Sequence, residues 1–554
     1  MAGRPRPRGL LLEHANVITL DPSRPRATAV YCRNGLVQAV GDADKLEDLM
    51  QEGDSRFDCG ELTLVPGFID SHCHFMAMGL NALRVDLSVV PERAALIMAL
   101  RERAEETREG EWVFGVDFDE TKWEGDRTLP TRELLDRLVS DRHPVVARRI
   151  CGHIAVANTM AMERIGPEWG EVDRETGLLL EDVVLRLSEV VGVTDEEAAM
   201  AIALATKRAH ELGVTSVVDM GDLRTLRTYR DLDRRGLLRV RVFCKVQARD
   251  LPDLERDDVP PGDLESNLHL AGVKAFLDGS LGARTAALGE PYSDDPGHPD
   301  NRGMLLYDAP SLEGLVREAE SYGLQLSLHA IGDRAVGMAL DAFERAGRPG
   351  NPLRHRIEHL EYATPEQLDR MKELRVVASM QPNFIVQWCG SGGMNEQRLG
   401  RERARTSEAL RDVWSRGIPL AFGSDNMPFG PLYGLHGAVH HPVEEQQLPP
   451  MVAMRAYTAG SAWAVNAERW LGTIERGKVA DMALLDTDPD HSQDLRGVRV
   501  VATVLGGELV NVDGEGFNRA VNLAAQRALE EALMDADMPR LDLEGPREDD
   551  EGDE

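Results

Sequence analysis

The sequence predicts a large parallel α/β barrel that carries an insertion, beside a smaller β-domain assembled from both ends of the chain. Apolar strand-like runs alternate with helix-like segments from about residue 66 to 465, a pattern typical of βα units around a parallel sheet. β-rich segments lie before and after this middle part. The chain has 554 residues. This length exceeds that of one ordinary compact domain but fits a large barrel with a smaller second domain.

The two ends of the chain share a pattern of short strands separated by turn residues such as Asn34-Gly35 and Gly506-Gly507. The β-rich segments predicted from this pattern are residues 9–20, 28–40, 61–65, 472–477, 483–486 and 500–505. We therefore expect residues 1–65 and 466–515 to form the two parts of one β-domain.

The middle of the chain, residues 66–465, is assigned to the barrel. Strands are expected at residues 215–220, 272–277, 325–329, 376–380 and 419–423. An insertion is placed at about residues 82–195, where turn residues gather around Trp112 and Trp123. Residues 516–554 are expected to form a C-terminal helix and then a disordered tail, because the tail is acidic and poor in apolar side chains.

The composition excludes several classes of partner. The formal net charge is −32, which argues against binding nucleic acid or an anionic membrane surface, since both require basic patches. The sequence has no run of 18 apolar residues that could span a membrane. Its six cysteines are scattered without a Cys-x-x-Cys pair, which favours free thiols and a cytoplasmic protein.

The strongest local motif is the segment PGFIDSHCHF at residues 66–75. On a strand, residues i and i+2 point to the same face, so His72 and His74 can bind one cation together. Neutral imidazole is a favoured ligand of zinc and similar ions. Taken alone, the motif fits two satisfied or exposed histidines without a metal better than it fits a metal site.

Further residues strengthen the metal interpretation, because each one ends a separate strand-like run. In a parallel barrel the carboxyl ends of all strands open on one face, and that face holds the active site. We therefore expect residues from distant parts of the sequence to meet there with the His-x-His pair; they are Lys274, His329, His359 and Asp425.

Lys274 is unusual, because only seven of the 63 basic residues are lysines. A protonated ammonium cannot bind a cation, whereas a carbamate formed from lysine and carbon dioxide has two oxygens that could bridge two ions. Arginine could not take this role, because its guanidinium stays protonated. The alternative is a lysine that forms a salt bridge or extends its ammonium to solvent.

The sequence resembles the amidohydrolase superfamily, in particular the amidohydrolase 3 branch that includes N-substituted formamide deformylases. The resemblance runs from residue 10 to about 510 and depends on the motifs PGFIDSHCHF, GVTSVVDMG, VKAFLDGSLGARTAAL, LHAIGDRAV, RIEHLEY, GSDNMP, YTAGSAWA and GTIERGKVADMALLD. It implies a distorted (β/α)8 TIM barrel beside a small composite β-sandwich domain. It also implies metal ligands at His72, His74, Lys274, His329, His359 and Asp425.

These residues predict a metal-dependent hydrolase that acts on a C–N bond of a small molecule, and the resemblance implies that this is a non-peptide bond, such as that of an N-formyl or other N-acyl amide. A divalent metal, zinc by default and two ions in number, would activate water, and Asp425 would act as the proton acceptor. Lys274 would be carboxylated. The alternatives are a deaminase, a cyclic-amide or phosphoester hydrolase, and a non-catalytic scaffold. Deaminases of the superfamily usually lack the bridging lysine, so Lys274 argues against a deaminase.

Five further residues are candidates for binding substrate, each with a structural alternative. Asp278 and Arg284 follow the Lys274 strand and could instead form an internal salt bridge. Asp333 could contact a ligand imidazole or begin a helix. His153 and Asn158 lie in the insertion, in a stretch similar across the branch. The resemblance also admits a homodimer, since barrel helices often pair in this superfamily.

Overall fold

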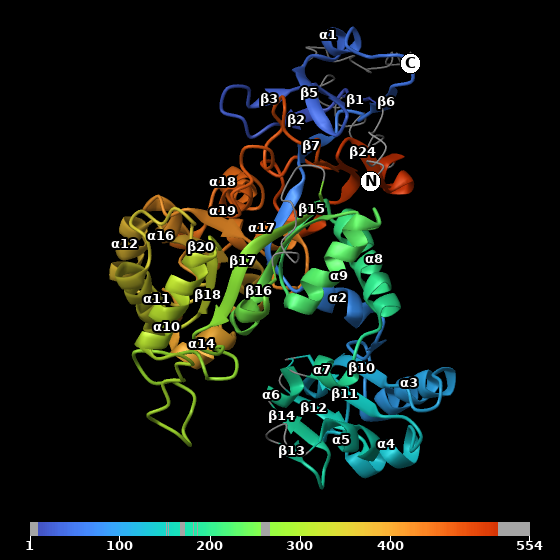
Figure 1. Ribbon diagram of the computed structural model, residues 1–554, viewed down its shortest axis with the longest axis vertical. Helices are drawn as coiled ribbons and strands as arrows, with labels where there is room; N and C mark the ends of the chain where they lie inside the picture. Colours follow the sequence, from blue (N-terminus) through green and yellow to red (C-terminus); the bar gives the residue numbers. More distant parts are fainter. Residues whose placement is uncertain are drawn as a thin grey trace, which may run out of the picture.

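The computed structural model describes residues 9–150, 152, 154–166, 172–180, 182–185, 187–255 and 266–518. Four sheets organise these residues. Figure 1 shows the barrel strands in the middle of the molecule, the insertion as a separate lobe, and the β-rich segments of both ends together on the opposite side. His153 and most of the predicted C-terminal helix and tail lie outside the described residues.

The central sheet has eight strands in the order β21-β20-β19-β18-β17-β16-β15-β8, and all its paired neighbours run parallel. The predicted fold class is confirmed, since this nearly closed parallel barrel accompanies separate sheets. The strands are β8 (Phe68–Cys73), β15 (Val214–Met220), β16 (Arg241–Gln247), β17 (Leu268–Phe276), β18 (Leu326–Ala330), β19 (Arg356–His359), β20 (Val377–Met380) and β21 (Leu420–Phe422).

The barrel closes between its two end strands, β8 and β21, through the loop that follows β21. The Asp425 amide donates to the His72 carbonyl at 2.8 Å, and the Ser424 amide donates to Asp70 Oδ1 at 3.0 Å. Gly423 permits this approach, because a Cβ atom there would lie 2.3 Å from the His72 nitrogen. The barrel is distorted, because hydrogen bonds from this loop close it and no strand ladder joins β8 to β21.

Helices with one apolar face cover the outside of the barrel (Figure 1). Their starts follow the capping rules: Thr194 and Glu197 form a capping box at the start of α8, and the Asp308 side chain accepts from the Ser311 amide at the start of α10. The covering helices include α8 (Asp195–Glu211), α9 (Leu223–Arg234), α10 (Ala309–Ser321), α11 (Asp333–Ala346), α12 (Pro365–Leu374), α16 (Leu410–Ser415), α17 (Pro431–Val439), α18 (Pro450–Ala456) and α19 (Ala459–Ala464).

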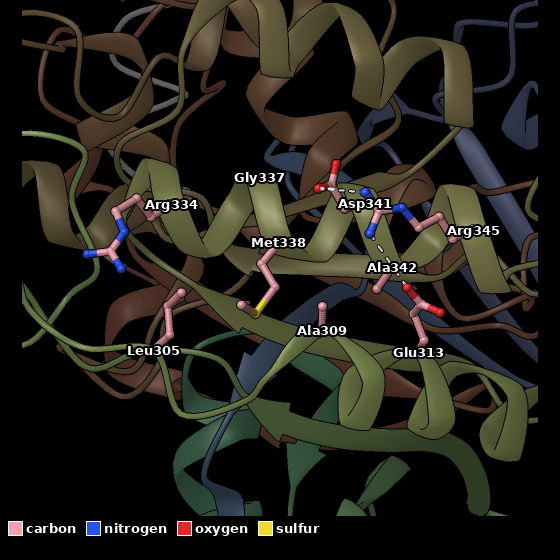
Figure 2. A pocket seen from close by; sticks show the side chains of 9 residues that line it. All are labelled: Leu305, Ala309, Glu313, Arg334, Gly337, Met338, Asp341, Ala342 and Arg345. Atoms are coloured by element: carbon pink, nitrogen blue, oxygen red, sulfur yellow. Dashed lines mark ion pairs between the residues drawn. The ribbon is translucent and has the colours of Figure 1, made fainter.

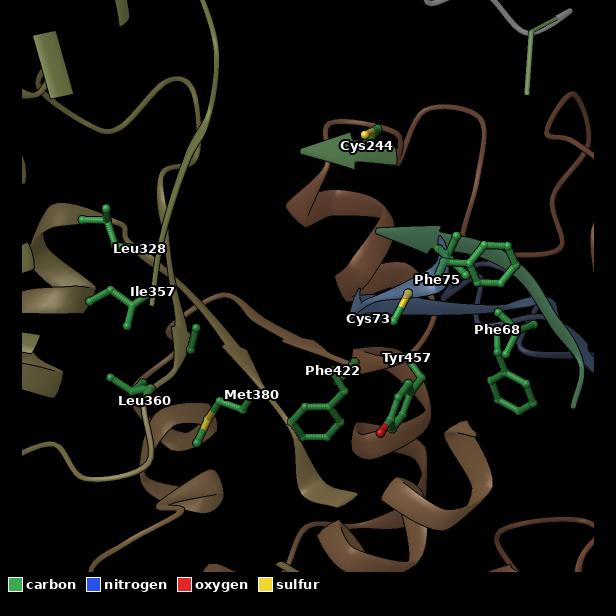
Figure 3. Packing of buried hydrophobic residues seen from close by; sticks show 14 of the residues in the cluster. Phe68, Cys73, Phe75, Cys244, Leu328, Ile357, Leu360, Met380, Phe422 and Tyr457 are labelled. Atoms are coloured by element: carbon green, nitrogen blue, oxygen red, sulfur yellow. The ribbon is translucent and has the colours of Figure 1, made fainter. Parts of the chain in front are cut away.

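The largest hydrophobic core lies between the barrel strands and these helices. Figure 3 shows part of it, with buried side chains that come from β8, β16, β18, β19, β20 and β21. Burial of these side chains is the main favourable contribution to folding.

The insertion has its own sheet, in the order β13-β14-β12-β11-β10-β9, and its own cores. It follows α2 (Phe75–Ala82) and precedes α8, and these two helices pack together. Its elements are β9 (Val85–Asp86), α3 (Arg93–Glu106), β10 (Val113–Phe118), α4 (Arg132–Leu138), β11 (Val145–Arg149), β12 (Ile154–Ala157), α5 (Thr159–Ile165), β13 (Val172–Asp173), β14 (Leu178–Leu180), α6 (Asp182–Leu185) and α7 (Leu187–Val191).

One terminal sheet combines both ends of the chain, in the order β24-β23-β22-β7-β2-β3, and a second has the order β5-β4-β1-β6. The prediction of strands at residues 472–477 is wrong: this segment is a loop, in which the Gly477 amide donates to the Val37 carbonyl. The strands are β1 (Leu10–Glu13), β2 (Asn16–Ile18), β3 (Arg26–Ala27), β4 (Ala29–Arg33), β5 (Leu36–Gly41), β6 (Ser55–Asp58), β7 (Thr63–Pro66), β22 (Met482–Leu485), β23 (Val500–Leu505) and β24 (Glu508–Val512).

Two further predictions concern the described part of the chain as a whole. None of its helices combines the length and the apolar character needed to cross a lipid bilayer. Its five cysteines are free thiols, as predicted, and four of them are buried.

Candidate metal centre

Three predicted ligands meet where β8 and β21 end. Among the described residues, His72, His74 and Asp425 form the group of metal-binding side chains whose ligand atoms lie within 4.8 Å of one another. Asp425 Oδ1 lies 3.2 Å from His74 Nε2 and 3.7 Å from His72 Nε2. Cys73, between the two histidines, belongs instead to the hydrophobic core, as the alternation of a strand requires.

The histidines that end β18 and β19 lie beside this group. The His72 and His359 ring centroids are 4.8 Å apart, and the His359 and His329 centroids are 4.5 Å apart. The structure therefore brings four imidazoles and one carboxylate together from four strands that are distant in sequence.

Each of three imidazoles has one nitrogen held by a partner. His72 Nδ1 donates to Glu358 Oε2 at 2.7 Å, and His359 Nδ1 donates to Gln381 Oε1 at 2.8 Å. His329 Nε2 donates to the Gly279 carbonyl at 3.0 Å, while its buried Nδ1 has no hydrogen-bond partner in the described structure. Imidazoles that bind a metal are normally held in this way through their other nitrogen, so the site fits a cation.

Lys274 lies on the neighbouring strand β17, and its side chain is buried; its role as a ligand stays a prediction. Its Nζ atom lies 4.9 Å from the centroid of the Phe276 ring. Burial lowers the pKa of Lys274 to about 8, because desolvation disfavours the charged amine. Roughly a tenth of this side chain is therefore the neutral amine at pH 7.

The surroundings of His72 and His329 favour neutral imidazoles, whereas the pKa of His74 is raised, because its interaction with Asp425 outweighs the opposite effect of burial. Burial, followed by the charge of Lys274, lowers the pKa of His72 to about 4 and that of His329 to about 3. Both side chains are therefore unprotonated near neutral pH, which is the form that binds metal ions.

Two residues with important contacts to the site, Arg356 and Glu358, were not predicted from the sequence. Arg356 Nη2 donates to Glu358 Oε2 at 3.1 Å and to the Ser71 carbonyl at 2.6 Å, and both side chains are fully buried. Strand alternation was the available signal, because Ile357 packs in the outer core and its two neighbours must face inward.

The sequence matches the amidohydrolase family over residues 56–511. The chain belongs to the amidohydrolase family.

Protein LONG AFTER FAR-RED 3 of Arabidopsis thaliana is 30% identical to this chain, over 90% of this chain and 91% of its own length. N-substituted formamide deformylase of Arthrobacter pascens is 25% identical over 91% and 98%. The crystal structure of an uncharacterized metal-dependent hydrolase from Pyrococcus horikoshii OT3 has a TM-score of 0.76 and 31% identity, over 88% of this chain and 99% of that chain. The protein is a metal-dependent hydrolase of this family.

Asp278 of this amidohydrolase lies next to the site, but its carboxylate is hydrogen-bonded to backbone amides. Its carboxylate accepts from the amides of Ala287, Ile331 and Gly332 at 2.8–3.0 Å, and its Oδ1 lies 3.6 Å from His329 Nε2. Burial raises the pKa of Asp278 to about 7. These contacts agree with a structural role, and a role in substrate binding stays a prediction.

The remaining predicted substrate residues of the amidohydrolase also have local partners. Arg284 forms two hydrogen bonds of 3.0 Å with Asp294, and Asp333 accepts from the Gly289 amide at 2.7 Å. Asn158 caps α5, where its side chain accepts from the amides of Val145 and Ala161 and donates to the carbonyls of Ser140 and His143. Substrate binding by these residues stays a prediction, and His153 lies outside the described residues.

A pocket of about 310 Å³ lies on the outside of the amidohydrolase barrel, between α10 and α11; Figure 2 shows the side chains that line it. Arg345 pairs there with Glu313 and Asp341. None of the predicted ligands lines this pocket, whose residues are Leu305, Ala309, Glu313, Arg334, Gly337, Met338, Asp341, Ala342 and Arg345. It therefore has no part in the metal centre.

Proposed function

We propose that this amidohydrolase cleaves the C–N bond of a small N-formyl or other N-acyl amide. The observation that carries the proposal is the convergence of His72, His74 and Asp425 within 4.8 Å, with further imidazoles beside them. The similarity to N-substituted formamide deformylase supports an amide as the substrate class. The family match supports hydrolysis, and the chemistry of the donor set supports zinc as the cation.

The ligands would be His72, His74, Lys274, His329, His359 and Asp425. A bound divalent cation would supply a lowered pKa for water and a polarised substrate carbonyl. The buried imidazoles would hold the cation while neutral, each fixed through its other nitrogen.

Lys274 would act as a carbamate that bridges two cations. Its neutral amine would attack the carbon of carbon dioxide: the N–C bond would form as one C=O π bond breaks and its electron pair moves to oxygen, and one proton would leave the nitrogen for solvent. The depressed pKa of Lys274, about 8, makes the required neutral amine available. The carbamate would add a second negative charge beside Asp425, which matches two divalent cations better than one carboxylate does.

Asp425 would accept the proton of the attacking water and then transfer it to the leaving nitrogen. Burial alone would raise its pKa, but the His72 and His74 side chains hold the pKa of Asp425 well below its usual range. The carboxylate is therefore ionised near neutral pH. Its position is fixed by the backbone hydrogen bond from its amide to the His72 carbonyl.

The test is the Asp425→Asn variant, assayed on formamides, N-acyl amino acids and cyclic amides. We expect a loss of turnover on the order of a thousandfold or more, because the amide side chain cannot accept the proton, with the far-UV circular dichroism spectrum unchanged. Asp341→Asn, on the outer helix α11, is the matched control and should keep wild-type rates. Near-normal turnover by Asp425→Asn would reject the assigned proton acceptor. Wild-type protein without activity on any amide would reject the substrate class.

A further inference from the structure

Two histidines lie one helical turn apart at the end of the covering helix α17. The His440 amide donates to the His436 carbonyl at 2.8 Å, so the helical turn extends to His440 and both side chains share one face of the helix. Their ring centroids are 4.6 Å apart, His440 is exposed and His436 is partly exposed. The next residue, His441, is buried instead, and its Nδ1 accepts from the Val443 amide at 3.0 Å. His436 and His440 therefore form a histidine pair that solvent reaches.

The separation of the two rings matches that of imidazoles that bind one ion. A metal–nitrogen bond of about 2.1 Å places the ion about 3.2 Å from the ring centroid, so ligand angles of about 90–110° put two centroids about 4.5–5.2 Å apart. The separation of 4.6 Å in the histidine pair falls in this range. The imidazoles of the candidate metal centre show the same spacing, with 4.8 Å between His72 and His359 and 4.5 Å between His329 and His359.

A carboxylate already contacts the second nitrogen of one imidazole of the pair. His436 Nδ1 is buried and lies 3.2 Å from Asp494 Oδ1. The Arg496 guanidinium fixes this carboxylate through hydrogen bonds of 2.9 Å and 3.0 Å. A carboxylate behind an imidazole orients a metal-binding histidine and makes its other nitrogen a better ligand. His436 Nε2 is therefore the nitrogen that can bind an ion together with His440.

The charges around the histidine pair also suit a cation. Burial, followed by the charges of Arg496 and His440, lowers the pKa of His436, so this imidazole is mostly neutral at pH 7, as metal binding requires. Hydrogen bonds from Arg496 lower the pKa of Asp494 to about 2, so the carboxylate is ionised and balances the guanidinium charge. The pair also lies at the carboxyl end of α17, where the backbone carbonyls favour a positive charge.

We propose that His436 and His440 bind one divalent transition-metal ion, such as Ni²⁺, Cu²⁺ or Zn²⁺, with solvent in the remaining positions. Imidazole ligands favour these ions over Mg²⁺ and Ca²⁺, which prefer oxygen. With two protein ligands this surface site is weaker than the buried metal centre, and it fills only when the solution supplies the ion. Asp494 lies in the loop between β22 and β23 of the terminal β-domain, so a bound ion strengthens a contact between that domain and the barrel.

The test is isothermal titration calorimetry of Ni²⁺ into untagged protein whose metal centre has been loaded with zinc. We expect wild type to bind Ni²⁺ with a dissociation constant on the order of 10 µM, since two imidazoles on one ion bind far more tightly than one. His440→Ala should weaken this binding by roughly a hundredfold, because the ion is then held by one imidazole. Asp494→Asn should weaken it by about tenfold, because His436 loses its ionised partner. Zinc content should stay at the wild-type level in both variants.

His491→Ala is the matched control. His491 is exposed and lies 3.7 Å from a carboxylate oxygen of Asp488, but no histidine stands four residues from it in the sequence, so its removal should leave the affinity unchanged. Thermal unfolding of every variant identifies a folding defect. Millimolar binding by wild type, or equal affinities of wild type and His440→Ala, would overturn the site. Equal losses in His440→Ala and His491→Ala would also overturn it, because they would show binding by scattered single histidines. These outcomes do not depend on the proposed hydrolysis.

Discussion

At the scale of single residues, the contact between His72 and Glu358 connects the candidate metal centre to the barrel interior. Glu358 accepts from His72 Nδ1 and from the Arg356 guanidinium. The carboxylate therefore sets both the tautomer and the orientation of His72, so that Nε2 faces Asp425. The fully buried Arg356 in turn balances the charge of the carboxylate.

Glu358→Gln should weaken zinc binding by about 10–100-fold, the usual effect of removing the partner of a metal-binding histidine. It should also lower the free energy of unfolding, because the buried Arg356 loses its counter-ion. Competition titration with a chromophoric chelator measures the first effect and urea denaturation the second. Glu344→Gln, a change at a solvent-exposed ion pair, should alter neither. Unchanged zinc affinity in Glu358→Gln would contradict the role of Glu358.

A second buried carboxylate, Glu408, is a source of instability. It is wholly buried, and neither of its oxygens has a hydrogen-bond partner in the described structure. Burial, followed by the neighbouring Glu361, raises the pKa of Glu408 well above its usual value near 4.5. Burial also raises the pKa of Glu361 to about 8. The folded protein therefore retains protons that the unfolded chain releases.

Because both pKa values are raised in the folded protein, the free energy of unfolding should fall as pH rises from about 4.5 to about 8. The stabilising contribution of the protonated carboxyls is complete below the unfolded-state pKa and is lost as pH passes the folded-state pKa. Glu408→Gln, which is neutral throughout, should be more stable than wild type by about 1–3 kcal/mol at pH 8. The gain should be much smaller at pH 5. Urea denaturation of both proteins at the two pH values measures the difference, and an equal or smaller gain at pH 8 would show that Glu408 has a partner.

At the scale of secondary-structure elements, the ends of the strands determine which side chains face the site. His72, Lys274 and His329 could be predicted because each lies near the end of an apolar run. His359 reaches the site differently: its backbone adopts a left-handed φ of 74°, whereas strand alternation places Glu358 on the inner face. Strand alternation alone would therefore predict Glu358 as the residue of β19 that faces the site. Only the bend of the backbone brings the His359 side chain beside the other candidate metal ligands.

The closure between β8 and β21 gives a prediction for Gly423. A Cβ atom there would meet backbone atoms of His72 at 2.3 Å and 2.8 Å, and backbone is less able to move than a flexible side chain. Gly423→Ala should therefore lower the free energy of unfolding by about 3 kcal/mol or more and reduce metal content. Gly314→Ala in α10, where the added Cβ meets no atom within 4 Å, should be neutral or stabilising. Equal stability of the two variants in urea denaturation would contradict loop-mediated closure.

At the scale of the whole molecule, the fold class could be predicted because it depends on the order of strand-like and helix-like segments. The joining of both chain ends in one sheet followed from their shared β-rich pattern. The sheet order of the insertion could not be predicted, because pairing between short strands such as β13 and β14 depends on contacts that no local pattern records. The substrate residues were likewise uncertain, since Asp278, Asn158 and Asp333 have backbone partners that only the folded chain reveals.

The whole-molecule claim is that side chains from distant strands form one metal centre, and elemental analysis of the purified protein tests it most directly. Inductively coupled plasma mass spectrometry of wild type and of the His72→Ala/His74→Ala double variant gives the metal bound per chain. We predict one or two equivalents of a divalent metal, zinc foremost, in wild type, and loss of most of this metal, together with hydrolytic activity, in the double variant. A wild-type protein that contains no stoichiometric metal and keeps full activity after dialysis against a strong chelator would contradict the claim.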